Sequence, residues 1–118
     1  MFGRLRVASV LLIAACVAAA AEPTAKVYKG HLVIAPEAEV FRPCGSNEPL
    51  WLDYTKAVRA SLFGRYIELR KKPYAETFVV LRGIPGPQLD CGYCEHFKGS
   101  FKVLEVIEQR ASGPAECK

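Results

Sequence analysis

Hydrophobic and polar residues alternate along several stretches of the chain, with the period of two that is typical of half-buried β-strands. The clearest stretch is AETFVVLRG at residues 75–83, which ends in a turn rich in glycine and proline. Pro36 interrupts another alternating stretch and divides it into two strands. The predicted strands are residues 26–35, residues 38–44, the run PLWLDY that ends its strand at Asp53, residues 75–83, and residues 99–110.

Between the third and fourth of these strands, apolar residues recur every three or four positions instead. This spacing over residues 53–63 predicts a helix, with Asp53 or Thr55 as its N-cap and Gly64 at its end. One helix at this place in a small all-β chain favours a small OB-like five-stranded barrel, and a β-sandwich with an added helix is the alternative. The side chains predicted to fill the barrel interior are those of Trp51, Phe41, Phe78, Phe101 and the strand valines.

The N-terminal residues have the three-part plan of a bacterial export signal. Arg4 and Arg6 make a basic start, residues 7–15 form an apolar core, and small residues follow. The apolar run is about 15 residues long, which is short for a membrane-spanning helix of about 20 residues. We therefore expect a signal peptide at residues 1–21, followed by a single domain at residues 22–118.

Two cleavage sites fit this signal. The small residues before Glu22 suit ordinary signal peptidase. The run IAAC at residues 13–16 resembles a lipobox, where a bacterial lipoprotein is cut before its cysteine and lipidated on the thiol. Lipidation of Cys16 would anchor the protein to a membrane through its acyl chains. The sequence leaves both cuts open, and either one places the mature protein outside the cytoplasm.

Export changes the chemistry expected of the cysteines. Cys44, Cys91, Cys94 and Cys117 remain after either cut, and an even set in an exported chain favours disulfides, with three connectivities open. The formal net charge of +4 falls to about +2 without the basic start, which argues against a dedicated nucleic-acid-binding protein. The basic run at residues 70–72 is interpreted as a solvated face. A mature domain of about 95 residues has a small core that disulfides would help to stabilise.

The run DCGYCEH raises four alternatives for Cys91 and Cys94. Covalent haem attachment requires a histidine directly after the second cysteine, and Glu95 stands there instead. A thioredoxin-like redox pair requires its cysteines at a helix N-terminus within a βαβ unit, which this strand-rich chain does not predict. The sequence therefore argues against both haem attachment and redox catalysis.

Metal binding is the third alternative. Cys91, Cys94 and His96 offer soft and borderline ligands for Cu(I) or Zn(II), and His31 or Cys44 would supply a fourth. The fourth alternative is a local disulfide that shapes an exposed loop. It is favoured because an exported protein meets an oxidising compartment and because a single short Cys-x-x-Cys is a weak metal signal. His31 is otherwise interpreted as a surface residue.

An ordered series of runs resembles a known family. GHLVIAPEAEVFRPCG, LWLD, FVVLRG and GSFKVLEV, followed by a terminal cysteine, resemble the C-terminal OB-fold domain of NlpE-like bacterial envelope lipoproteins over roughly residues 27–117. The resemblance implies a periplasm-facing barrel tied to the envelope. It also implies that Cys44 pairs with Cys117, which leaves Cys91 and Cys94 for each other. The N-terminal domain of full-length members is associated with copper handling and signalling and has no counterpart in these runs, so neither activity is carried over.

Neither the serines nor the carboxylates of the chain stand in a recognisable catalytic motif, so we expect no enzyme and no cofactor. We interpret the chain as a non-catalytic, exported protein of the bacterial envelope, with the lipoprotein form favoured. We expect it to act as a binding or interaction module, for example in envelope sensing. We place it in the periplasm, held at the outer membrane if Cys16 is lipidated. The expected partner is an envelope protein or a small ligand, not nucleic acid, and the expected state is a monomer. The alternative is a periplasmic copper- or zinc-binding protein that uses Cys91, Cys94 and His96.

Overall fold

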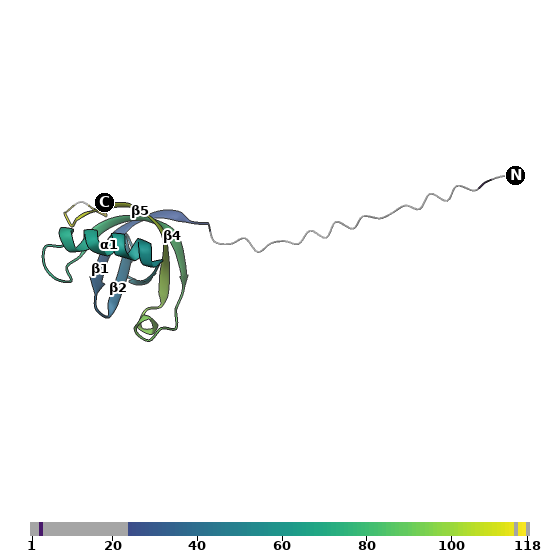
Figure 1. Cartoon of the computed structure of the whole chain (residues 1–118), viewed down its shortest axis with the longest axis horizontal. Coiled ribbons are helices and arrows are strands. Elements are labelled where there is room, and N and C mark those ends of the chain that lie inside the picture. Colours follow the sequence, from purple (N-terminus) through teal and green to yellow (C-terminus); the bar gives the residue numbers. More distant parts are fainter. Residues whose placement is uncertain (1–2, 4–23, 115, 118) are drawn as a thin grey trace.

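The computed structural model describes residues 3, 24–114, 116 and 117, and in it five strands form a closed barrel (Figure 1). The strands are β1 Lys26–Ala35, β2 Ala38–Pro43, β3 Leu50–Asp53, β4 Thr77–Pro87 and β5 Gly99–Ala111. Helix α1, Lys56–Leu69, joins β3 to β4, and a 3₁₀ turn, η1 Tyr93–His96, joins β4 to β5. The predicted OB-like, five-stranded barrel with one helix between the third and fourth strands is confirmed.

The strands follow the order β1-β2-β3-β5-β4 around the barrel, and β4 pairs with β1 to close it. The β3–β5 pair is parallel, and the other four pairs are antiparallel. The β4–β5 ladder extends from Thr77 opposite Ala111 to Pro87 opposite Gly99. Strand β4 therefore continues past the predicted end at Gly83, because its pairing with β5 persists through the glycine- and proline-rich stretch.

The barrel interior is filled by residues that alternate along the strands, together with two residues of α1. The core side chains are Leu32, Ile34, Phe41, Leu52, Leu62, Tyr66, Val79, Leu81, Phe101 and Val103. Within this core, the ring centroids of Phe41 and Phe101 lie 4.9 Å apart. Two aromatic residues predicted to lie inside do not belong to this core. Trp51 is half-buried against Phe97, with 5.5 Å between ring centroids, and Phe78 is buried outside this core cluster.

Helix α1 is longer than predicted, because it continues past Gly64 to Leu69. The extra turn carries Tyr66, which is buried one turn after Leu62 and whose hydroxyl donates a hydrogen bond to the Ala75 carbonyl, at 2.8 Å. Tertiary burial of this turn outweighs the weak helix propensity of a single glycine. At the other end, the predicted alternative with Thr55 as N-cap is the one found, since its hydroxyl accepts from the Val58 N–H at 3.3 Å.

The predicted signal peptide, residues 1–21 with the candidate lipidation site Cys16, falls outside the described residues apart from Gly3. Within the part of the chain that the structure describes, no helix is both long enough and apolar enough to span a bilayer.

Candidate functional site

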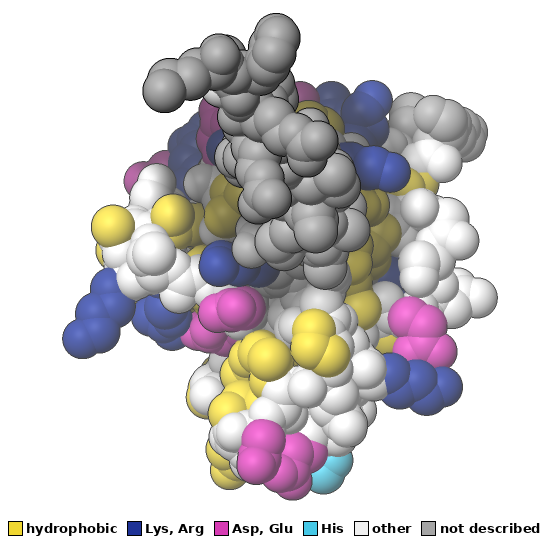
Figure 2. All heavy atoms as spheres, turned by 90° about the vertical axis from the view of Figure 1, so that its right-hand side faces the viewer, with side chains coloured by type: hydrophobic (Ala, Val, Ile, Leu, Met, Phe, Trp, Pro, Cys, Tyr) yellow, Lys and Arg dark blue, Asp and Glu magenta, His cyan; other side chains and the backbone are white. Residues whose placement is uncertain are grey.

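The two-cysteine loop lies between β4 and β5 and is closed by a disulfide between Cys91 and Cys94. Gly92 adopts a φ of 83°, a conformation that glycine reaches without steric cost, and so allows the tight ring. The side chain of Gln88 donates to the backbone carbonyl of Glu95 at 2.7 Å, which braces the loop from within. On the face in Figure 2, acidic side chains and a histidine gather at the lower end of the barrel, where η1 lies in Figure 1.

The metal site predicted for this loop needed His31 or Cys44 as a fourth ligand, and the structure places both elsewhere. His31 pairs with Phe78 near the start of β4, whereas the loop follows the end of that strand. At about 3.3 Å per residue, the two positions are separated by roughly 30 Å along the strand. Cys44 is bonded to Cys117. Among the described residues, no group of three or more histidine, cysteine, aspartate or glutamate side chains is arranged to hold a metal.

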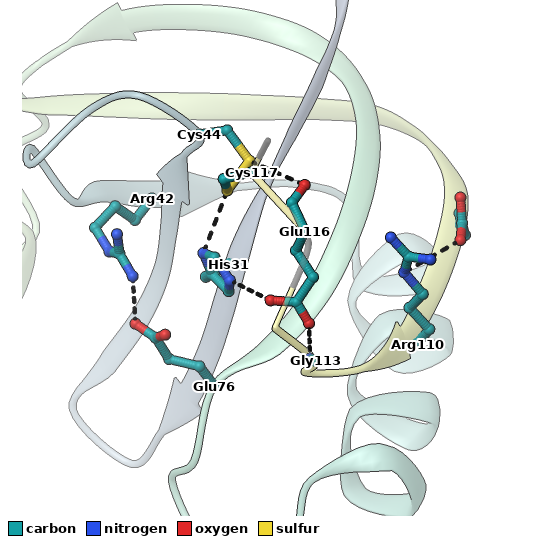
Figure 3. A network of polar contacts seen from close by, with 9 residues as sticks. His31, Arg42, Cys44, Glu76, Arg110, Gly113, Glu116 and Cys117 are labelled. Carbon is teal, nitrogen blue, oxygen red and sulfur yellow. Dashed lines mark hydrogen bonds and ion pairs between the residues drawn. A yellow bond between two sulfur atoms is a disulfide. The ribbon is translucent and has the colours of Figure 1, made fainter.

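A second polar cluster surrounds the Cys44–Cys117 disulfide (Figure 3). The Nε2 atom of His31 lies 2.9 Å from Oε2 of Glu116, so the imidazole N–H donates to the carboxylate. The other ring nitrogen, Nδ1, faces the Cys117 sulfur at 3.9 Å. The Gly113 N–H donates to the second oxygen of the same carboxylate. The disulfide and these hydrogen bonds together hold the C-terminal segment against the barrel.

This cluster covers Phe78. The His31 and Phe78 rings are arranged edge to face with 6.2 Å between their centroids, and the guanidinium of Arg110 lies 4.3 Å above the Phe78 ring. The side chain of His31 is only 13% exposed, so its interpretation as a surface residue is wrong. The sequence carries no local signal for the contact between His31 and Glu116, because Glu116 stands 85 positions further along the chain.

The electrostatic state of Glu116 is set by opposing effects. Burial of the carboxylate raises its pKa, but the hydrogen bonds from His31 and Gly113 and the positive charges of His31 and Arg110 outweigh burial. The pKa of Glu116 therefore lies below its ordinary value of 4.5. The Glu116 carboxyl group therefore loses its proton more readily in the folded protein than in the unfolded chain.

We expect the Glu116→Gln variant to be less stable than the wild type at pH 7, with a difference that shrinks as the pH falls below about 4.5. A carboxylate whose folded-state pKa is depressed stabilises the fold fully above its unfolded pKa, and this contribution disappears as the pH falls through the folded-state pKa. Thermal unfolding followed by circular dichroism between pH 7 and pH 3 measures the difference. The matched control is Glu105→Gln, which removes an exposed ion pair with Arg82 and should have little effect. A Glu116→Gln difference that is constant over this range would contradict the expectation.

A solvent-open groove of about 300 Å³ runs between α1 and the turn that joins β1 to β2. The end of β1 contributes Ile34 and Ala35, the turn contributes Pro36, and the helix contributes Phe63 and Ile67. These two side chains are 37% and 39% exposed and lie one helical turn apart, so they form an apolar stripe beside the buried one. Tyr74 also lines the groove and is 55% exposed. The predicted helix stopped before Ile67, so sequence analysis missed this stripe.

The two walls of the groove are tied together by Glu39 of β2. Its carboxylate accepts a hydrogen bond of 2.6 Å from the Tyr54 hydroxyl and one of 2.7 Å from Nε of Arg59. Burial raises the pKa of Tyr54, and the hydrogen bond to Glu39 raises it further. The hydrogen bond with Glu39 and its negative charge likewise raise the pKa of Arg59. This network fixes the start of α1 against the β1–β2 hairpin, so the groove is already formed without a ligand.

Tyr74 adopts a φ of 63°, in the left-handed region that a bulky side chain rarely occupies. Strained backbone of this kind persists only where the surrounding structure holds it, and it is enriched at ligand-binding sites. Here the Tyr66 hydroxyl holds the neighbouring Ala75 carbonyl. This contact holds the strained backbone beside the groove that the exposed Tyr74 lines.

Comparison of the chain with protein-family models, with curated proteins and with solved structures finds no match. The functional argument therefore rests on the described residues and their geometry.

Proposed function

We propose that the protein is a non-catalytic, exported binding module of the bacterial envelope, and that the groove beside α1 is its ligand site. The observation that carries the proposal is the stripe formed by Phe63 and Ile67, two large apolar side chains that face an open, preformed groove. Small-molecule sites are usually concave and combine apolar side chains with a few polar groups. The groove has both, because Arg59 and Arg70 line it together with the apolar stripe, and its volume of about 300 Å³ is at the small end of the usual range.

The export part of the proposal is supported by the composition of the N-terminal residues and by the oxidised cysteines. The structure joins Cys44 to Cys117 and Cys91 to Cys94, which agrees with the pairing that the resemblance to NlpE-like lipoproteins implies. Disulfides persist in oxidising compartments such as the bacterial periplasm.

Binding in the groove is tested with N-phenylnaphthylamine, a neutral dye that fluoresces when it leaves water for apolar surroundings. We expect the wild type to bind the dye and the Ile67→Asp variant to bind it more than about tenfold more weakly, because the variant places a charge on the apolar stripe. The matched control is Ile107→Asp, since Ile107 is 49% exposed on β5 and lies outside the groove. Equal loss of binding in both variants, or no binding by the wild type, would overturn the groove as the ligand site. Circular dichroism checks that both variants fold.

Export is tested by the N-terminus of the protein isolated from the bacterial envelope. We expect the chain to begin at Glu22, or at a Cys16 that incorporates a palmitate analogue. A mature protein that keeps Met1 would contradict export.

A further inference from the structure

Two arginines line the groove, Arg59 and Arg70, and only one of them is neutralised by a carboxylate among the described residues. Arg59 lies at one end and is paired with Glu39. Arg70 lies at the other end, and its guanidinium sits 5.8 Å above the Tyr66 ring rather than beside a carboxylate. It takes part in none of the ion pairs formed by the described residues. The net positive charge of the groove is therefore concentrated at its Arg70 end.

The residues that follow reinforce this asymmetry. Lys71 and Lys72 come directly after Arg70 and are exposed. With a rise of about 1.5 Å per residue, Arg59 and Arg70 are roughly 16 Å apart along the helix axis. Phe63 and Ile67 occupy the interval between them. The groove therefore has an apolar stripe between two arginines. Arg59 at one end is neutralised by Glu39, and the Arg70 end is basic.

We propose that the groove binds a single-chain carboxylate amphiphile, such as a fatty acid. Its chain would lie along Phe63 and Ile67, and its carboxylate would meet the guanidinium of Arg70. A planar guanidinium can bind a carboxylate through two parallel hydrogen bonds, which gives both affinity and orientation. Stacking on Tyr66 already orders the Arg70 side chain, so less side-chain entropy is lost on binding. The inference rests on the proposed function and names the ligand class for the same site.

Isothermal titration calorimetry with three ligands that each carry a ten-carbon chain tests the inference. The ligands are decanoate and cationic decyltrimethylammonium, each below its critical micelle concentration, and neutral decanol, below its solubility limit. We expect the wild type to bind decanoate about tenfold more tightly than decanol, because a charge-assisted hydrogen bond contributes to this extent. The cation should bind most weakly. Added salt should reduce the preference for decanoate over decanol, since the basic end is exposed.

Two arginine variants of the same helical segment separate the head-group contact from general charge. Arg70→Gln should lose about the tenfold preference for decanoate while keeping its affinity for decanol. Arg65→Gln is the matched control, because Arg65 pairs with Glu68 and lies outside the groove, and it should bind all three ligands as the wild type does. If Arg70→Gln does not fold, Arg70→Lys decides the same question, because it keeps the positive charge but loses the planar fork, and it should therefore lose most of the preference for decanoate.

The outcomes distinguish the two proposals. Equal affinity of the wild type for the three ligands would overturn the carboxylate inference but leave the groove as a ligand site. Binding of none of them, together with no binding of the neutral dye, would overturn both. Anionic phosphatidylglycerol vesicles that sediment the wild type and Ile67→Asp equally, with no decanoate binding, would assign residues 70–72 to a membrane surface and also overturn the inference.

Discussion

Replacement of Cys44 and Cys117 by serine is expected to lower the free energy of unfolding by about 3–4 kcal/mol, and the same replacement of Cys91 and Cys94 by at most about 2 kcal/mol. The first disulfide joins residues 73 positions apart, and the second joins residues 3 positions apart. A long closed loop restricts the unfolded chain more than a short one does, so its removal costs more.

The long disulfide also has a packing role that the short one lacks. Without it, the segment that carries Glu116 is released from His31, and Phe78 loses part of its cover. These losses add to the entropic effect. The short disulfide shapes a loop that keeps its hydrogen bond between Gln88 and the Glu95 carbonyl.

Urea unfolding of the two double-serine variants measures this difference. Circular dichroism follows the fold, and the chain's single tryptophan gives a second signal for the same transition. The intact mass of the untreated wild type should lie about four mass units below that of the reduced protein, because each disulfide removes two hydrogens. Equal destabilisation of the two variants would show that the C-terminal segment is not held as the structure describes.

The Gly83→Ala variant should lose about 3 kcal/mol of stability, whereas Gly64→Ala should gain roughly 0.5–1 kcal/mol. A methyl group at Gly83 would meet the backbone carbonyl of Lys102 and the ring of Phe101. Neither can move freely, because Lys102 belongs to β5 and Phe101 is fully buried in the barrel. Overpacking of a buried site commonly costs this much.

Gly64 is the matched control for this substitution. It lies inside α1 and is exposed, and a methyl group there would meet no atom within 4 Å. Alanine favours the helix over glycine because it restricts the unfolded backbone. Thermal and urea unfolding of both variants measure whether each substitution raises or lowers the free energy of unfolding. A Gly64→Ala variant that is destabilised would contradict the helix past residue 63, and a neutral Gly83→Ala would contradict the close approach of β4 to β5.

The strands could be predicted because each one carries its own signal. Alternation along β1 places Leu32 and Ile34 in the core, and Pro36 marks the turn that follows. The order of elements then led to the barrel, since a single helix between the third and fourth strands is characteristic of the OB-like arrangement. Local patterns were sufficient where the buried face of an element repeats within that element.

Features that depend on distant parts of the chain could not be predicted in this way. The local pattern predicts that the helix ends at Gly64, whereas burial of Tyr66 in the barrel extends it to Leu69. The hydrophobicity of Trp51 predicts that it lies inside the barrel, whereas its neighbour Leu52 is the β3 residue that enters the core. The groove needs α1 and the β1–β2 turn to meet, so only the three-dimensional structure shows it.

The parallel pairing of β3 with β5 has a consequence for the order of events during folding. Trp51 in β3 lies opposite Ser100 in β5, so two distant parts of the chain must meet before the barrel can close. Pairings of this kind slow folding, because the entropy of a long loop is lost before its contacts form. Strand β5 follows all the other strands and pairs with both β3 and β4. During synthesis or export from the N-terminus, the barrel therefore cannot close until nearly the whole chain is available. Until then, the chain is accessible to chaperones and proteases.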